Sequence, residues 1–147
     1  MLRFEGDKTF GRPQAEVWTK LTDARFLLEC LPDVDQVKVA EADQAVFVIR
    51  PGLAFVRGNL DVTMRIIEKV EPTSIRYLLL SKGIGSSSTV EALLTLAAQD
   101  TQTQVHWVAE IKELGGLLKL VPSGLIRGAA QKVIGDVWDR VEAKLVS

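Results

Sequence analysis

Few side chains in this sequence have the chemistry for catalysis, and the spacing of those few does not bring them together. His106 is the single histidine and stands between Val105 and Trp107 in a segment that alternates apolar and polar residues. Because successive side chains of a strand point to opposite faces, we expect the imidazole on the outer surface. Catalysis needs a nucleophile with a base, or two titratable groups in one pocket. The sequence offers no such arrangement, and we predict no catalytic residue.

The other charged residues of the alternating segments share the outer phase, which is typical of a solvated sheet surface. They are Asp61, Arg65, Glu91, Glu110 and Lys112. One cysteine and one histidine cannot provide the usual zinc-ligand spacings, so we predict no metal and no cofactor. Cys30 precedes Leu31-Pro32 at a predicted helix end, where we expect a small buried hydrophobe.

Two further features have a structural and a functional interpretation. Tyr77 is the inward-facing candidate with a polar group, and a buried phenol usually finds a hydrogen-bond partner. We expect a backbone oxygen as that partner, with a ligand carbonyl as the alternative. The segment from Gly83 to Ser88 is similar to a phosphate-binding loop, but it has no lysine in the required position and leads into a strand. It predicts a hairpin turn.

The composition excludes several classes of protein. A chain of 147 residues indicates one domain, 1–147, and 18 Lys and Arg against 19 Asp and Glu give no basic field for nucleic acid. No apolar stretch is long enough for a transmembrane segment, and the charged residues near the N-terminus do not suit a signal peptide. The single cysteine is typical of a reducing compartment, so we expect a cytoplasmic protein.

The expected fold class is α+β, with a curved antiparallel sheet wrapped around a long C-terminal helix. A first strand is predicted over Phe4–Phe10, followed by one short helix after Pro13 and a second that Asp23 caps and that ends before Pro32. Alternation as far as about residue 113 predicts further strands joined by hairpins, about seven in all. Helical periodicity then predicts a helix from Ser123 to about Val146, whose apolar stripe needs the concave face of the sheet.

This order of elements resembles the helix-grip fold of the START-like, or SRPBCC, superfamily. A narrower resemblance rests on short motifs in sequence order: Phe4-Glu5-Gly6, Pro13 with Val17-Trp18, Leu21-Thr22-Asp23, Cys30-Leu31-Pro32, Pro51-Gly52 through Gly58, Thr103 to Trp107, Gly115 to Leu118, and the helix from Gly128 to Trp138. Through them the chain resembles, over nearly its whole length, the family of the CoxG subunit of carbon monoxide dehydrogenase. Longer members of that family resemble membrane-recruiting accessory proteins of molybdenum hydroxylases. Their C-terminal hydrophobic anchor is not expected here.

The resemblance implies a cavity between the sheet and the long helix that holds a hydrophobic small molecule. The inward-facing residues expected to line it are Phe26, Leu27, Leu60, Val62, Met64, Tyr77, Leu79, Val90, Leu94, Trp107, Ile111, Ile126, Ala130 and Ile134. We therefore expect a binding or carrier protein for a lipid, quinone or polyketide-like compound, accessory to a molybdenum hydroxylase-type redox enzyme. One alternative is an enzyme similar to polyketide cyclases and dehydratases, in which Tyr77 assists. The other is an interaction module in which the same side chains fill a solid core.

Two stretches are apolar on both faces of a predicted strand, namely Ala45–Ile49 and Leu78–Leu80. A strand of this kind needs cover on the convex side of the sheet. The hypothesis is a homodimer or docking to a larger enzyme. The alternative is that another part of the same chain provides the cover.

Overall fold

The computed structural model describes residues 2–51 and 58–146, and its elements follow the predicted order. The first strand is β1 (Leu2–Phe10), which begins two residues before the predicted start, and the two short helices are α1 (Gln14–Leu21) and α2 (Ala24–Cys30). Six strands follow: β2 (Val34–Ala40), β3 (Gln44–Ile49), β4 (Leu60–Val70), β5 (Ser74–Gly83), β6 (Ser86–Gln99) and β7 (Gln102–Gly116). The short 3-10 helix η1 (Leu117–Leu120) then leads to α3 (Ser123–Val146).

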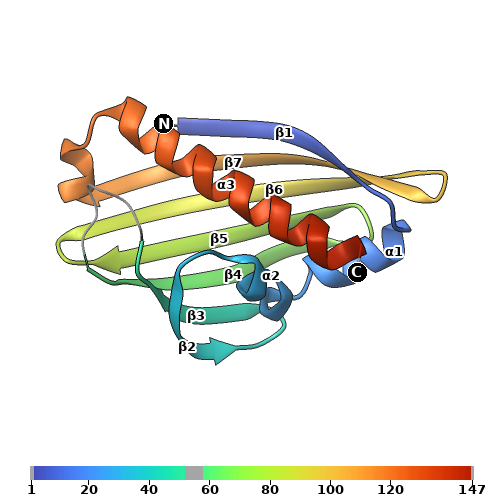
Figure 1. Cartoon of the computed structure of the whole chain (residues 1–147), viewed down its shortest axis with the longest axis horizontal. Helices are drawn as coiled ribbons and strands as arrows, with labels where there is room; N and C mark the ends of the chain where they lie inside the picture. The colour runs from blue at the N-terminus through green and yellow to red at the C-terminus, as the bar shows by residue number, and fades with distance from the viewer. Residues whose placement is uncertain (1, 52–57, 147) are drawn as a thin grey trace.

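The seven strands within the described residues form one antiparallel sheet in the order β1-β7-β6-β5-β4-β3-β2. The first and last strands of the sequence are therefore neighbours, whereas the strands from β2 to β7 pair in sequence order. The sheet curves, and α3 lies across its concave side (Figure 1). This arrangement confirms the predicted α+β helix-grip architecture.

The short helices are defined by local signals that the sequence contains. Pro13 is the residue before α1, and the Asp23 carboxylate accepts a hydrogen bond of 2.9 Å from the Arg25 backbone N–H at the start of α2. Hydrogen bonds from Arg25 also hold the pKa of Asp23 below its ordinary value. Both helices lie beside the C-terminal end of α3, where Arg140 donates a hydrogen bond of 3.0 Å to the Leu31 carbonyl.

One irregularity between β6 and β7 changes which side chains face inward. Thr89 pairs with Glu113 but the next residue, Val90, pairs with Ile111, so β7 contains one extra residue at this point. Such a β-bulge shifts the alternation of the side chains beyond it. The strand continues to Gly116, past the predicted limit near residue 113.

The convex side of the sheet is only partly covered by the chain itself. Val48, on the outer phase of β3, is 7% exposed, whereas Leu80 of β5 is 37% exposed. The prediction of a homodimer or a larger docking partner stays open at Leu80. Part of the family resemblance falls on residues 52–57, which lie outside the described residues. Within residues 2–51 and 58–146, no helix is both long and apolar enough to cross a membrane.

Candidate functional site: a cavity between the sheet and α3

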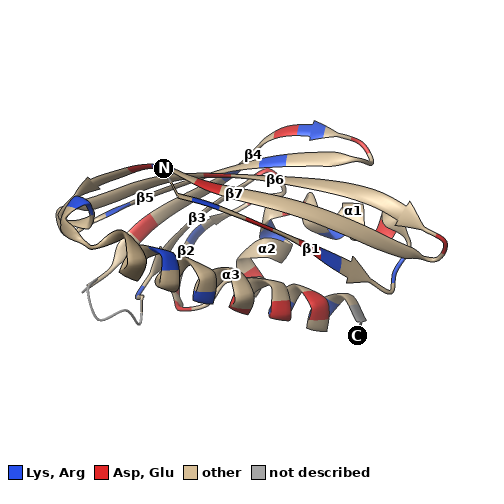
Figure 2. Cartoon of the chain, turned by 90° about the horizontal axis from the view of Figure 1, so that it is seen from above, with Lys and Arg blue, Asp and Glu red and all other residues tan. Residues whose placement is uncertain are grey.

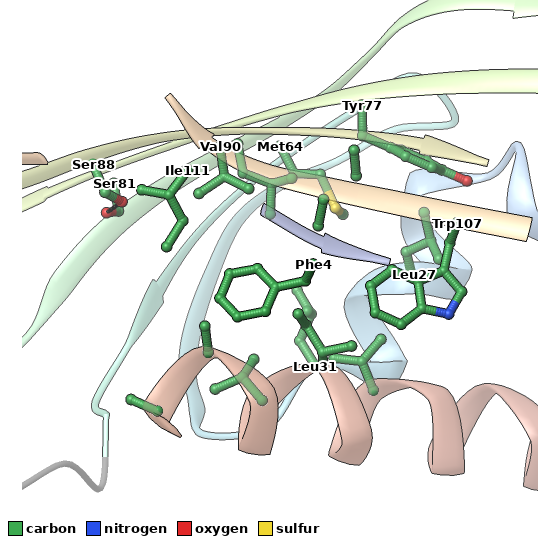
Figure 3. Close-up of a pocket in the computed structure, with 18 of the residues that line it drawn as sticks. Phe4, Leu27, Leu31, Met64, Tyr77, Ser81, Ser88, Val90, Trp107 and Ile111 are labelled. Carbon is green, nitrogen blue, oxygen red and sulfur yellow. Dashed lines mark hydrogen bonds between the residues drawn. The ribbon is translucent and has the colours of Figure 1, made fainter. Parts of the chain in front are cut away.

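A cavity of about 400 Å³ lies between the concave face of the sheet and α3. Figure 3 shows Met64, Val90 and Ile111 projecting from the sheet toward the helix, with Phe4 between the two layers. Leu27 and Leu31 close the side next to α2. The apolar residues therefore do not form the solid core that the interaction-module alternative requires.

The structure brings together most of the residues proposed from the sequence. Those that line the cavity are Leu27, Leu60, Met64, Tyr77, Leu79, Val90, Leu94, Trp107, Ile111, Ile126, Ala130 and Ile134. Phe26 and Val62 are not among the described lining residues. Val62 is buried and lies beside Phe47 of the neighbouring strand β3, and the Phe26 ring lies 5.6 Å from the Lys20 ammonium. Neighbouring residues of a helix point about 100° apart, and at this position of α2 it is Leu27 that lines the cavity.

The remaining lining residues were not proposed from the sequence: Phe4, Leu21, Leu31, Ser81, Ser88, Ala92, Val108, Ala109, Leu114, Leu118, Ala129, Val133, Val137, Trp138 and Val141. Residues that are two apart on a strand share a parity and face the same side of the sheet, and this pattern could have identified several of them. Ser81 has the parity of Tyr77 and Leu79, and Ala92 has the parity of Val90 and Leu94. Many of these side chains are small, and small inward side chains are what leaves space under the helix.

The Tyr77 ring lines the cavity, whereas its hydroxyl bonds to the protein backbone. The hydroxyl donates a hydrogen bond of 2.6 Å to the carbonyl of Leu21, and in Figure 3 it points away from the cavity. Leu21 is the last residue of α1, where carbonyl groups lack a partner within the helix. Burial raises the pKa of the phenol above its ordinary value. The expectation of a backbone oxygen as partner is confirmed.

Two serines form another polar feature of the cavity. The hydroxyls of Ser81 on β5 and Ser88 on β6 are hydrogen-bonded to each other, at the end of the cavity away from Tyr77 (Figure 3). No charged side chain lines the cavity in the described part of the chain. Because its hydroxyls already have partners within the protein, the cavity suits hydrocarbon better than a charged or strongly polar group.

Aromatic rings form the side of the cavity next to β1. The rings of Trp107 and Trp138 are 6.2 Å apart, and Phe10 lies 6.0 Å from Trp138. A Cβ atom added to Gly6 would lie 2.9 Å from the Trp107 ring, closer than van der Waals contact allows. Glycine at position 6 therefore lets the indole approach the first strand closely.

The groups with the greatest chemical reactivity lie outside this cavity. His106 is exposed, as predicted, and its Nδ1 lies 3.0 Å from a carboxylate oxygen of Asp7. Cys30 is fully buried, as predicted, and burial raises the pKa of its thiol to about 11. No cluster of His, Cys, Asp and Glu able to hold a metal ion occurs among the residues that the structure describes.

Comparisons with known proteins agree with this geometry. The family model for CoxG, a subunit of carbon monoxide dehydrogenase, matches residues 6–146. A comparison with curated proteins finds no significant match.

Solved structures show where the same fold occurs. A conserved protein from Geobacillus kaustophilus is 21% identical with a TM-score of 0.86, covering 99% of this chain and 95% of that one. A START superfamily protein from Mycobacterium smegmatis is 7% identical with a TM-score of 0.69, covering 97% and 96%. The likeness establishes a START-like fold.

Proposed function

The chain belongs to the CoxG family, named for a subunit of carbon monoxide dehydrogenase, and from this we propose that it binds a hydrophobic small molecule and carries it unchanged. The observation that carries the proposal is the cavity of about 400 Å³ beneath α3, whose lining is almost entirely apolar. Its volume lies within the range of about 300–1,000 Å³ that ligand sites usually have. Lipids, quinones and polyketide-like compounds are the classes of ligand that such a lining accommodates.

The driving force for binding is the removal of apolar ligand surface from water. Each methylene group that enters the cavity contributes about 0.8 kcal/mol, which is about a fourfold gain in affinity. The Tyr77 hydroxyl is bonded to the Leu21 carbonyl and the two serine hydroxyls to each other, so few hydrogen-bonding groups of the lining are left to select a ligand. Size and shape then select the ligand.

The polyketide cyclase-like alternative depends on Tyr77 as a catalytic group. Its hydroxyl is committed to the Leu21 carbonyl, and its raised pKa makes proton transfer near neutral pH unfavourable. These observations favour a carrier. We further propose that the carried molecule is delivered to a larger redox enzyme of the molybdenum hydroxylase type, in keeping with the name of the family.

Native mass spectrometry of the purified protein tests the proposal directly. We expect a mass above that of the chain which returns to the chain mass after denaturation and extraction with organic solvent. The extracted protein should then bind n-alcohols, with an affinity in calorimetry that rises about fourfold per methylene from octanol to decanol.

A matched pair of variants on α3 places the binding in the cavity. Ala130 lines the cavity and Ala143 is exposed on the same helix. Ala130→Phe fills space and should weaken decanol binding at least tenfold, whereas Ala143→Phe should leave it unchanged. Equal binding by the two variants, or no binding of any alcohol by the parent chain, would overturn the proposed function.

A further inference from the structure

A second hollow, a cleft of about 460 Å³, lies between β1 and α3 next to the cavity. Four side chains, namely Phe4, Trp107, Ile134 and Trp138, line both hollows. A single layer of aromatic and aliphatic side chains therefore separates the apolar cavity from this cleft. A ligand that displaces part of this layer would reach from one into the other.

The cleft differs from the cavity in its charge. Among the described residues, three basic ones line it, Arg3 and Lys8 from β1 and Arg127 from α3, against one acidic residue, Glu5. Figure 2 shows basic residues on both of these elements. Arg3 lies 3.7 Å from Glu5, but both side chains are more than half exposed, and such a pair is weak in water. The cleft has an excess of positive charge.

Lys8 occupies a position on β1 where the alternation of the strand predicts an apolar, inward-facing residue. On β1, Phe4 and Phe10 face the concave side and are 7% and 1% exposed, and Lys8 has the same parity. Its side chain is half-buried, and no carboxylate or other hydrogen-bond partner is found for it within residues 2–51 and 58–146. An ammonium group without a partner among the described residues gains from an anionic one, and Lys8 lines a cleft that is open to such a group.

Arg127 holds a corresponding position on the helix. Its guanidinium carbon lies 5.1 Å from the centre of the Phe4 ring, and in the described part of the chain it forms no ion pair. Stacking on an aromatic ring fixes the plane of the guanidinium and leaves its N–H edges free for a carboxylate or phosphate. The cation therefore lies directly on the layer that divides the cleft from the cavity.

We propose that this cleft binds the anionic head group of an amphiphilic ligand whose hydrocarbon part occupies the cavity. The inference rests on the proposed function and specifies its ligand class, a hydrocarbon chain with one carboxylate or phosphate at its end. A charged head group inside the cavity would lose its hydration without gaining a charged partner there. In the cleft it meets Lys8 and Arg127, and the chain enters the cavity past Phe4.

Three probes of equal chain length test this assignment by calorimetry at pH 7.5: decanol, decanoate and decyl phosphate. We expect the parent protein to bind at least one of the two anionic probes tenfold or more tightly than decanol. The preference should shrink as salt is raised, because ions screen the attraction. In the double variant Lys8→Gln, Arg127→Gln the anionic probe should lose at least tenfold in affinity, while decanol binding should stay within about twofold.

Lys132→Gln is the matched control, because Lys132 lies on the same helix outside the cleft and pairs with Asp136 at 3.0 Å. It should keep the preference for the anionic probe. If the parent protein binds decanol as tightly as both anionic probes, or if the Lys132 variant loses as much as the double variant, the head-group assignment is wrong while the carrier function stands. If none of the three probes binds, the proposed function fails and the assignment with it.

Discussion

The substitution Tyr77→Phe separates a structural role of this residue from a catalytic one. It removes one oxygen atom, keeps the ring that lines the cavity, and leaves the Leu21 carbonyl at the end of α1 without its 2.6 Å hydrogen bond. A buried acceptor that loses its partner costs about 1–3 kcal/mol. With an expected loss of about 2 kcal/mol and a denaturant slope of about 2 kcal/mol/M, the midpoint of urea unfolding should fall by about 1 M.

The assay is urea unfolding of the parent and variant, followed by calorimetry of the folded proteins with decanol. We expect the lower midpoint together with a decanol affinity within about twofold of the parent, because the ring and the space around it are unchanged. An unchanged midpoint would show that the hydroxyl does not stabilise α1. A folded, equally stable variant with tenfold weaker binding would show that the hydroxyl acts on the ligand, and would revive the cyclase-like alternative.

Three further predictions concern Cys30, His106 and Gly6. The pKa of Cys30 is raised from 9.0 to about 11 in the folded state, so its contribution to stability is complete below pH 9 and is lost as pH rises through 11. The free energy of unfolding of Cys30→Ala, measured against pH, should therefore fall by about 2–3 kcal/mol less over this range than that of the parent. His106→Ala removes an exposed side chain, so unfolding should change by less than about 0.5 kcal/mol and calorimetry should show unaltered decanol binding; a large loss of binding would contradict its outward placement. Gly6→Ala places a Cβ atom 2.9 Å from the Trp107 ring, so the ring must move. Thermal unfolding should show a loss of stability of about 1–3 kcal/mol, and calorimetry should show a changed decanol affinity. Gly128→Ala is the control, because a Cβ atom there meets nothing within 4 Å and should not destabilise the protein.

The elements of this fold were predictable because local patterns and tertiary packing agree. Alternation along β4 and β7 and the apolar stripe of α3 each reflect one buried face, and Asp23 and Pro32 fix the ends of α2 by local chemistry. The bulge opposite Thr89 was not predicted, because no glycine or turn residue stands next to Lys112, and the nearest glycines, Gly115 and Gly116, follow three and four residues later. The position of Leu114 in the cavity follows from that bulge.

The cavity itself was harder to predict than its walls. Parity shows which side of a strand faces inward, but a void depends on how far the facing layers are held apart and on where small side chains meet. Ala92, Ala109 and Ala129 all line the space, and none of them stands out in a sequence as a binding residue. Phe26 was proposed together with Leu27 because both are large and apolar, and the described lining contains Leu27 without Phe26.

The positions of the three tryptophans make the empty and occupied states optically distinguishable. Trp107 and Trp138 line the cavity and lie 6.2 Å apart, whereas Trp18 is buried in α1 and is not among the described lining residues. Indole emission responds to the polarity of the surroundings, so the entry of a ligand should change the emission of two of the three chromophores, while Trp18 contributes a constant background. The unlabelled protein is thus its own fluorescent sensor, and the exchange of cargo with an acceptor can be followed in real time without a reporter group.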